Sequence, residues 1–232
     1  MADEILMRVI AHIRSPYPDK FGIPRQSGIV EAAQAQIVFL PEYRDTEALR
    51  GIEGFSHLWL LWQFSANRKT GFQPTVRPPR LGGNRRMGVF ATRSPYRPSP
   101  IGLSAVRLLG LEHSSENGTV LRISGADLMD GTPILDIKPY LPYADCIPEA
   151  VGGFASEKPD AALRVLMPES ASGTLPEGIR AALTDVLAQD PRPRYQHDPD
   201  RIYSLRFAGY EVRFTVEDDL LTVRSIELEN LL

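Results

Sequence analysis

The chain has 232 residues, a formal net charge of −3, 43% hydrophobic residues and 24% charged residues, enough to bury a core in one domain with a small second unit. The N-terminus has neither a basic patch nor a long apolar run, which argues against a secretory signal or a transit peptide. A single cysteine, Cys146, excludes an internal disulfide and a Cys-rich zinc site, so we expect a soluble cytoplasmic protein with no membrane segment and no metal.

The first half of the chain predicts a series of short strands. Apolar residues alternate over residues 5–11, and residues 35–40 form a second apolar segment that ends at Pro41. Residues 58–64 are apolar at nearly every position, as expected for a strand at the centre of a sheet. Further strands are predicted at residues 87–92, 103–111, 119–124 and 134–137. Six or more short strands joined by Pro- and Gly-rich loops are typical of a closed or rolled barrel.

The second half has a different pattern. Residues 146–175 are rich in Pro, Gly, Ala and Ser, which predicts a linker between a barrel domain at 1–145 and a C-terminal domain at 176–232. Apolar residues at helical spacing from Ile179 to Leu187 predict an amphipathic helix. Three strands follow in the sequence pattern, at residues 202–207, 211–216 and 221–226. The expected fold is therefore mainly β, with a small C-terminal α+β domain.

Charge is unevenly distributed along the chain. Residues 55–111 contain no Asp or Glu, although the whole chain has 29 of them, and they contain nine Lys and Arg. A positive face of this size suits a polyanion such as RNA, because phosphate contacts and counterion release supply sequence-independent affinity. A merely solvated basic face remains the alternative.

The common signatures of cofactor binding and hydrolysis are absent from the sequence. No G-x-G-x-x-G follows a predicted strand, and there is no P-loop, H-E-x-x-H or G-x-S-x-G pattern. The four histidines lie far apart without metal-ligand spacing. A dinucleotide-type domain and a zinc protease are therefore not expected.

Four loops are unusually rich in Pro, Gly and Arg. They lie at residues 15–26, 76–85, 91–102 and 127–133. Proline restricts φ and glycine permits close backbone approach, so such loops can hold arginines beside a ligand. Each loop taken alone could equally be a simple connector.

These stretches resemble the bacterial tRNA methyltransferase family called TrmO or YaeB. The matching segments are IRSPYPDKFGIPRQ, GIEGFSHLWLLWQF, VRPPRLGGNRRMGVFATRSPYRPSPIG, DLMDGTPILDIKPYLPYAD and VLAQDPRPRY. The resemblance implies a single-sheeted β-barrel that binds S-adenosylmethionine near a homodimer interface. It also implies methylation of N6 of threonylcarbamoyladenosine next to the anticodon of threonine tRNA.

The resemblance also assigns residues to the cofactor. The expected contacts are Pro24, Arg25, Gln26, Ser65, Ala66, Arg93, Leu103, Asp127, Leu128, Met129, Asp130 and Gly131. The sequence departs from the family pattern at two places: Phe64 is followed by Ser65 where relatives have His, and Ser99 stands where Asn is common. A side-chain contact from Ser65 would be weaker than one from His, whereas a backbone contact would be unaffected.

Catalytic and RNA-binding residues are hypotheses at this stage. The N6 atom is a poor nucleophile, so a group that accepts its proton or orients it is expected, and we consider Asp136 or Tyr140. Lys138 would bind phosphate or pair with Asp136, and a structural salt bridge between Asp136 and a nearby arginine is the alternative. Residues predicted to bind tRNA are Arg77, Arg80, Arg85, Arg86, Arg97 and Lys138, and stabilising the dimer is the alternative for the five arginines. The rival function is a barrel that binds an adenosyl ligand or RNA without catalysis.

Overall fold

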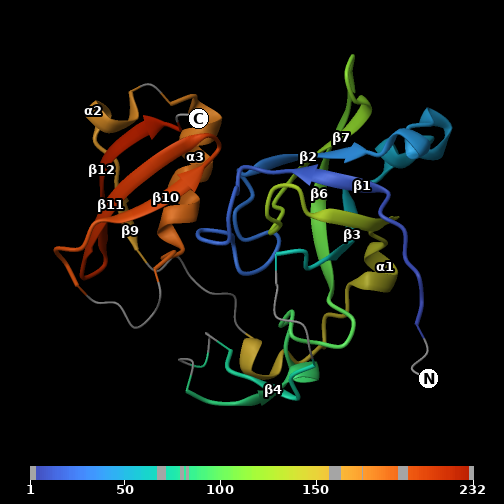
Figure 1. The fold of residues 1–232 in the computed structure, drawn as a ribbon, viewed down its shortest axis with the longest axis horizontal. Helices are drawn as coiled ribbons and strands as arrows, with labels where there is room; N and C mark the ends of the chain where they lie inside the picture. The colour runs from blue at the N-terminus through green and yellow to red at the C-terminus, as the bar shows by residue number, and fades with distance from the viewer. Residues whose placement is uncertain are drawn as a thin grey trace.

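The computed structural model describes residues 4–66, 72–78, 81, 84–156, 163–173, 175–192 and 198–229. Within these ranges the chain is mainly β, which confirms that part of the predicted fold class. Figure 1 shows two β units side by side, one formed by the first half of the chain and one by the last third. None of the described helices combines the length and the apolar composition that a membrane-spanning helix needs.

Six strands of the first half form a closed barrel in the order β1-β2-β7-β6-β3-β8, and every neighbouring pair is antiparallel. The strands are β1 (Ala11–Arg14), β2 (Gln34–Phe39), β3 (His57–Gln63), β6 (Ile101–Ser114), β7 (Gly118–Ser124) and β8 (Pro133–Pro139). Pairing of β1 with β8 joins the first strand to the last, so the sheet has no free edge at this seam.

The barrel core follows the alternation of the strands. In β3, Leu58, Leu60 and Trp62 are buried, whereas Trp59 and Leu61 on the other face are only partly buried. Strand side chains alternate between two faces, so the inward residues of all six strands meet in one apolar cluster. Because β3 pairs with both β6 and β8, it is the interior strand that its apolar sequence predicted.

Shorter elements connect these strands. A two-stranded sheet of β4 (Thr75–Val76) and β5 (Met87–Gly88) lies in the basic segment, residues 55–111, which contains no Asp or Glu. Helical connections are the 3-10 helices Pro41–Tyr43, Thr46–Leu49, Ile52–Gly54, Val89–Ala91 and Gly153–Ala155, and the short helix α1 (Pro142–Asp145).

Two predicted strands of the first half differ from the structure. The strand expected at residues 5–11 begins only at Ala11, and Ile5 and Leu6 are almost fully exposed. Its partner β2 ends at Phe39, just before Pro41, so the earlier residues run past the end of β2. The strand expected at residues 87–92 is limited to β5, because Val89–Ala91 forms a 3-10 helix.

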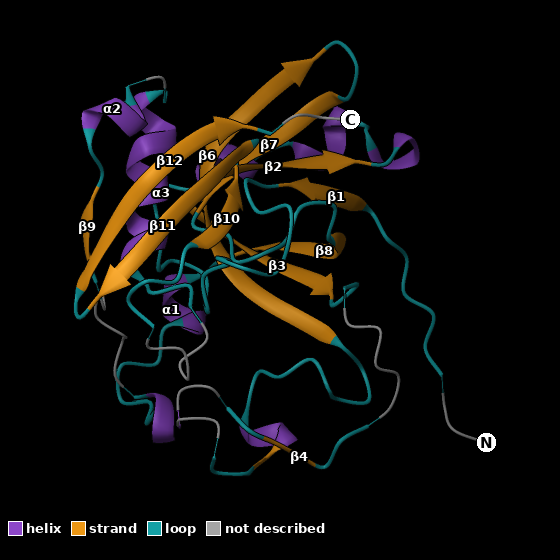
Figure 2. Ribbon diagram, turned by 60° about the vertical axis from the view of Figure 1, so that its left-hand side comes forward, coloured by secondary structure: helices purple, strands orange, loops and turns teal. Residues whose placement is uncertain are grey.

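The C-terminal unit is a four-stranded sheet with the order β10-β11-β12-β9. Figure 2 shows helix α3 against this sheet, and the buried Leu183 and Leu187 of α3 pack in the same cluster as the strands. Its elements are β9 (Arg164–Leu166), α2 (Glu169–Ser172), α3 (Glu177–Ala188), β10 (Tyr203–Phe207), β11 (Tyr210–Glu217) and β12 (Leu220–Leu228).

The linker expected at residues 146–175 is too long. β9 lies within it and pairs in parallel with β12, from Arg164 opposite Leu220 to Leu166 opposite Thr222. Three residues are too few for an alternating pattern to stand out in the sequence, and the pairing joins segments more than fifty residues apart. The C-terminal unit therefore begins before the predicted helix.

One connection in the barrel belongs structurally to both units. Residues 15–33, here called the N-terminal loop, join β1 to β2. Tyr17, Val30 and Ala33 of this loop are buried in the apolar cluster of the C-terminal unit, and Phe21 and Ile23 pack against that cluster. The N-terminal loop is thus held between the barrel and the C-terminal sheet.

Candidate functional site

A cavity of about 380 Å³ is lined by both the barrel and the N-terminal loop. Its walls come from five parts of the chain, within residues 20–26, 62–66, 93–97, 101–103 and 127–132. This volume is typical of sites for small ligands and cofactors. Four of these five parts overlap or adjoin the Pro-, Gly- and Arg-rich loops that the sequence singles out.

The barrel side of the cavity is built on a chain of hydrogen bonds. The indole N–H of Trp62 donates to Ser104 Oγ at 3.0 Å, and Ser104 Oγ donates to Asp127 Oδ1 at 2.6 Å. Trp62 on β3 is paired with Gly102 on β6, and a Cβ atom at Gly102 would lie only 2.2 Å from the indole ring. Glycine is therefore required at position 102 for the indole to take this position.

Asp127 carries the most perturbed carboxyl group of the cavity. Burial raises its pKa above the ordinary value, although the hydrogen bond from Ser104 and the positive charge of Arg93 act in the opposite direction. The carboxyl group of Asp127 is therefore largely shielded from water and held in place by its hydrogen bond from Ser104. It is suited to accept hydrogen bonds from the hydroxyl or amino groups of a ligand.

Three arginines also line the cavity. Arg93 donates to the side-chain oxygen of Gln26, which links the segment before β6 to the N-terminal loop. Arg97 also lines the cavity and donates to the backbone oxygen of Thr92 at 3.1 Å. Arg25 is the third. The cavity lining therefore combines three arginines with the buried carboxyl group of Asp127.

Nine of the twelve residues predicted to contact the cofactor line the cavity, and their role as contacts stays a prediction. They are Pro24, Arg25, Gln26, Ser65, Ala66, Arg93, Leu103, Asp127 and Met129. The other three shape the turn after β7. Leu128 is buried in the barrel core, Asp130 accepts a hydrogen bond from the Ser15 N–H at 2.9 Å, and Gly131 has a positive φ of 73°.

The residues considered for catalysis lie apart from the described cavity walls. Asp136 forms an ion pair with Lys138 at 2.9 Å, as in the pairing alternative for Lys138, and this partner is a lysine instead of the arginine expected for a structural salt bridge. Tyr140 packs against the rings of His57 and Trp59. The structure brings neither residue to the cavity of this chain, and a catalytic role for either stays a hypothesis.

The predicted RNA-binding residues fall into two groups. Arg77, Arg85 and Arg86 are exposed and lie in the acid-free segment, with Arg77 directly after β4. Arg80 lies outside the described residues. Arg97 lines the cavity instead of the outer surface, so its place favours a role toward a ligand in the cavity.

Sequence reasoning missed the hydrogen-bonded chain at Trp62 and Ser104. A usable signal exists in β6, where Gly102 and Ser104 occupy inward positions of an alternating strand and are both buried. A serine at a core position needs a polar partner inside, and that partner is Asp127. Among the described residues, no group of three or more His, Cys, Asp or Glu could hold a metal ion.

Comparison with known proteins agrees with this geometry. The family model of the tRNA-methyltransferase O N-terminal domain matches residues 12–146, and the model of the TrmO C-terminal domain matches residues 161–229. The chain belongs to the tRNA-methyltransferase O family. The two matched regions correspond to the barrel with its N-terminal loop and to the C-terminal unit that starts with β9.

Similar proteins of the tRNA-methyltransferase O family include one of Escherichia coli (strain K12) named tRNA (adenine(37)-N6)-methyltransferase, 41% identical over 227 residues, which cover 94% of this chain and 96% of that protein. A Pseudomonas aeruginosa (strain PAO1) protein, RcsF, is named as a candidate S-adenosylmethionine-dependent methyltransferase; it is 43% identical over 88% of this chain and 90% of its own length. The crystal structure of TrmO from Pseudomonas aeruginosa matches with a TM-score of 0.81 and 35% identity, over 98% of this chain and 100% of that one.

Proposed function

We propose that this chain methylates N6 of threonylcarbamoyladenosine next to the anticodon of threonine tRNA, with S-adenosylmethionine bound in the cavity. Its broader activity follows from its family: the chain is an S-adenosylmethionine-dependent tRNA (adenine-N6)-methyltransferase. The observation that carries the proposal is the cavity, which is lined by nine predicted contacts, among them Asp127 with its buried carboxyl group. We take the closed six-stranded sheet to be the single-sheeted barrel expected of the family.

The cavity residues suit S-adenosylmethionine, which combines an apolar ring with polar and charged ends. Ile23, Phe64 and Ile101 offer a flat base an apolar surface. Asp127 offers a carboxyl group to ribose hydroxyls or to an amino group, and Arg93 and Arg25 can bind a carboxylate. The volume of about 380 Å³ is compatible with a ligand of this size.

The contribution of the protein to catalysis is placement. S-adenosylmethionine supplies a methyl group on a sulfonium centre whose positive charge disappears during transfer. Such a displacement requires the donor and the acceptor nitrogen to lie in line, with water excluded. Trp62 and Phe64 pack edge to face with ring centroids 4.3 Å apart and form a rigid apolar side of the cavity. The hydrogen bonds from Trp62 to Ser104 and from Ser104 to Asp127 hold that side in place.

The acceptor would reach the cavity from the basic segment. Exposed Arg85 and Arg86 lie in the acid-free segment, residues 55–111, whose other arginines include Arg93 and Arg97 of the cavity lining. Phosphates of a tRNA bound along this segment would place a nucleotide near the cavity. We also propose a homodimer, as the family resemblance implies, which sedimentation of the full chain would test.

The decisive assay uses tRNA that already carries threonylcarbamoyladenosine. The full chain is incubated with S-adenosylmethionine and this tRNA, and the nucleosides are weighed by mass spectrometry. We expect a gain of about 14 mass units, one methyl group for one hydrogen, on that nucleoside. Threonine tRNA with unmodified adenosine at the same position is the matched control and should gain nothing. Binding of S-adenosylmethionine without any mass gain would support a non-catalytic module instead.

The tRNA-binding role of the basic segment predicts a salt-dependent loss. Arg85→Ala/Arg86→Ala should weaken tRNA binding about fivefold near physiological salt and reduce the slope of log K against log salt by roughly 1.4 to 1.8. Filter binding across a salt series measures both quantities. Arg50→Ala, which removes an exposed arginine paired with Glu47, serves as the control. An unchanged slope in the double variant would contradict the role of these two residues.

A further inference from the structure

The N-terminal loop is supported by the C-terminal unit at the point where it lines the cavity. Lys20, Ile23, Pro24, Arg25 and Gln26 are cavity residues, and they follow directly on Tyr17, which is buried in the C-terminal cluster. In sequence the C-terminal sheet lies almost two hundred residues away from this loop. The position of one cavity wall therefore depends on contacts made by the other unit.

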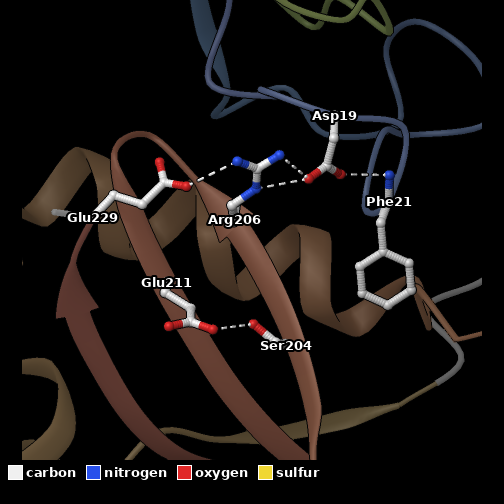
Figure 3. Close-up of polar contacts among 6 residues, drawn as sticks. All are labelled: Asp19, Phe21, Ser204, Arg206, Glu211 and Glu229. Atoms are coloured by element: carbon white, nitrogen blue, oxygen red, sulfur yellow. Dashed lines mark hydrogen bonds and ion pairs between the residues drawn. The ribbon is translucent and has the colours of Figure 1, made fainter. Parts of the chain in front are cut away.

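Arg206, on the C-terminal sheet, forms an ion pair with the N-terminal loop. Arg206 on β10 donates through Nε to Asp19 Oδ2 at 2.9 Å, its Nη2 lies 2.9 Å from the same oxygen, and its Nη1 donates to Glu229 Oε1 at 3.2 Å (Figure 3). Glu229 keeps the guanidinium oriented from the side of the C-terminal sheet. Arg206 thus connects a carboxylate of its own unit to a carboxylate of the N-terminal loop.

Asp19 also stabilises a turn of the N-terminal loop, so its contact with Arg206 affects the residues that follow. Its other oxygen, Oδ1, accepts a hydrogen bond from the Phe21 N–H at 2.8 Å, which closes a tight turn in the loop (Figure 3). The turn lies immediately before Ile23 and Pro24, which line the cavity. Holding Asp19 in place therefore also holds the start of the cavity segment in place.

Neighbouring contacts on β10 act on the same part of the loop. The Ala208 N–H, just after β10, donates to the Pro16 oxygen at 2.8 Å, and the rings of Tyr17 and Phe207 pack edge to face. Gly22 lies so close to Leu205 that a Cβ atom would be 2.3 Å from its Cδ1, and its φ is +88°. The loop thus follows β10 from residue 16 to residue 22 and then turns into the cavity.

We propose that Arg206 is a positioning residue for S-adenosylmethionine binding, which it supports by clamping Asp19 and so fixing the cavity segment at residues 23–26. This inference rests on the proposed function of the cavity. Arg206 does not itself line the cavity. It acts by reducing the number of conformations that the loop must lose when the cofactor binds.

The size of the effect follows from the exposure of the pair. The side chains of Arg206 and Asp19 are 48% and 35% exposed, so solvent screens their attraction and the ion pair contributes little to stability by itself. We expect Arg206→Ala in the full chain to raise the Kd for S-adenosylmethionine about fivefold. The KM for S-adenosylmethionine should rise in parallel, whereas kcat and the KM for tRNA should change less than about twofold.

Calorimetric titration of S-adenosylmethionine into the full chain measures this Kd, and steady-state methylation measures the two KM values and kcat. The matched control is Arg213→Ala, which removes a similarly exposed arginine of the same sheet that pairs with Glu211 at 3.1 Å. Its Kd should equal that of the parent chain. A lower melting temperature for Arg206→Ala without a change in Kd would overturn the proposal, because a purely structural role predicts that result.

Two further variants separate the ion pair from the turn. Asp19→Asn keeps an oxygen for the Phe21 N–H but loses the charge, so its Kd should rise in the same direction, and Asp19→Asn/Arg206→Ala should be no weaker than Arg206→Ala alone. Arg206→Lys keeps the positive charge but cannot bind both carboxylates with the geometry of a guanidinium. Its Kd should therefore lie between those of the parent and of Arg206→Ala. Additive losses in the double variant would overturn the proposal. Absence of binding in the parent chain would instead contradict the proposed function.

Discussion

The two sides of the cavity are stabilised by different means. The barrel side consists of Trp62, Ser104 and Asp127, held by strand register and by hydrogen bonds that are largely shielded from water. The loop side is residues 20–26, held by the C-terminal unit through half-exposed contacts such as that of Arg206 with Asp19. Buried, fully bonded networks are rigid, whereas exposed pairs are weak and screened. Changes on the barrel side should therefore affect folding and binding together, and changes on the loop side mainly binding.

The strongest test of this difference is Gly102→Ala. Its new Cβ atom would overlap the indole of Trp62, so the ring must move and the cavity loses its barrel side. We expect the free energy of unfolding to fall by about 1–3 kcal/mol and binding of S-adenosylmethionine to be abolished. Urea unfolding and calorimetry measure the two effects. Gly54→Ala, where a Cβ atom would meet open space, is the control. Unchanged stability in Gly102→Ala would show that the barrel side is adaptable.

Asp127→Asn should weaken cofactor binding about tenfold, because a charged hydrogen-bond acceptor is replaced by a neutral one. The free energy of unfolding of this variant should rise at neutral pH, although its cofactor binding is weaker. Burial raises the pKa of Asp127, so its favourable contribution is complete at acidic pH below the ordinary pKa and is lost as the pH rises through the raised pKa. Urea unfolding should therefore find the variant more stable than the parent at neutral pH and equal to it at acidic pH. A variant less stable at neutral pH would contradict this assignment.

Ser104→Ala tests the link between the two other residues of the barrel side. It leaves the Trp62 N–H without its acceptor and Asp127 without its donor, which should cost about 1–3 kcal/mol of unfolding free energy. Cofactor binding should fall by a few-fold as Asp127 loses its orientation. Ser204→Ala removes an exposed hydroxyl bonded to Glu211 and should change stability by less than about 0.5 kcal/mol. Equal effects of the two serines would contradict a buried network.

The smallest effect is expected outside both sides of the cavity, at Asp136. This carboxylate is 41% exposed and paired with Lys138, so Asp136→Asn should lower turnover less than about twofold. Single-turnover methylation with saturating cofactor measures the rate. A loss of about a hundredfold, with cofactor binding intact, would restore Asp136 as the base that the sequence suggested and would place the acceptor on that surface.

The sequence pattern predicted the elements that depend on local periodicity. The apolar run that predicted β3, the pattern that predicted three strands at β10 to β12, and the helical spacing that predicted α3 all correspond to observed elements. The sequence pattern gave wrong bounds where pairing between distant segments determines which residues form a strand. β9 is too short to show a period, and residues 5–10 continue an apolar alternation beyond the end of β2. Ser104 was overlooked because its partner Asp127 follows the next strand.

The candidate site shows the same limit. Pro-, Gly- and Arg-rich loops indicated where ligand contacts would gather, and family resemblance supplied the residues. Resemblance could not separate the turn formers Leu128, Asp130 and Gly131 from the side chains that face the cavity. The contact of Asp19 with Arg206, made across the two units, could not be predicted from any local pattern.

Calorimetric titration of S-adenosylmethionine into the full chain tests the central claim most directly. The cavity described above predicts saturable binding of one cofactor molecule per chain, weakened about tenfold by Asp127→Asn and unaffected by Arg213→Ala. Absence of binding to the folded chain, or equal affinity in the parent and in Asp127→Asn, would contradict the assignment of this cavity to the methyl donor.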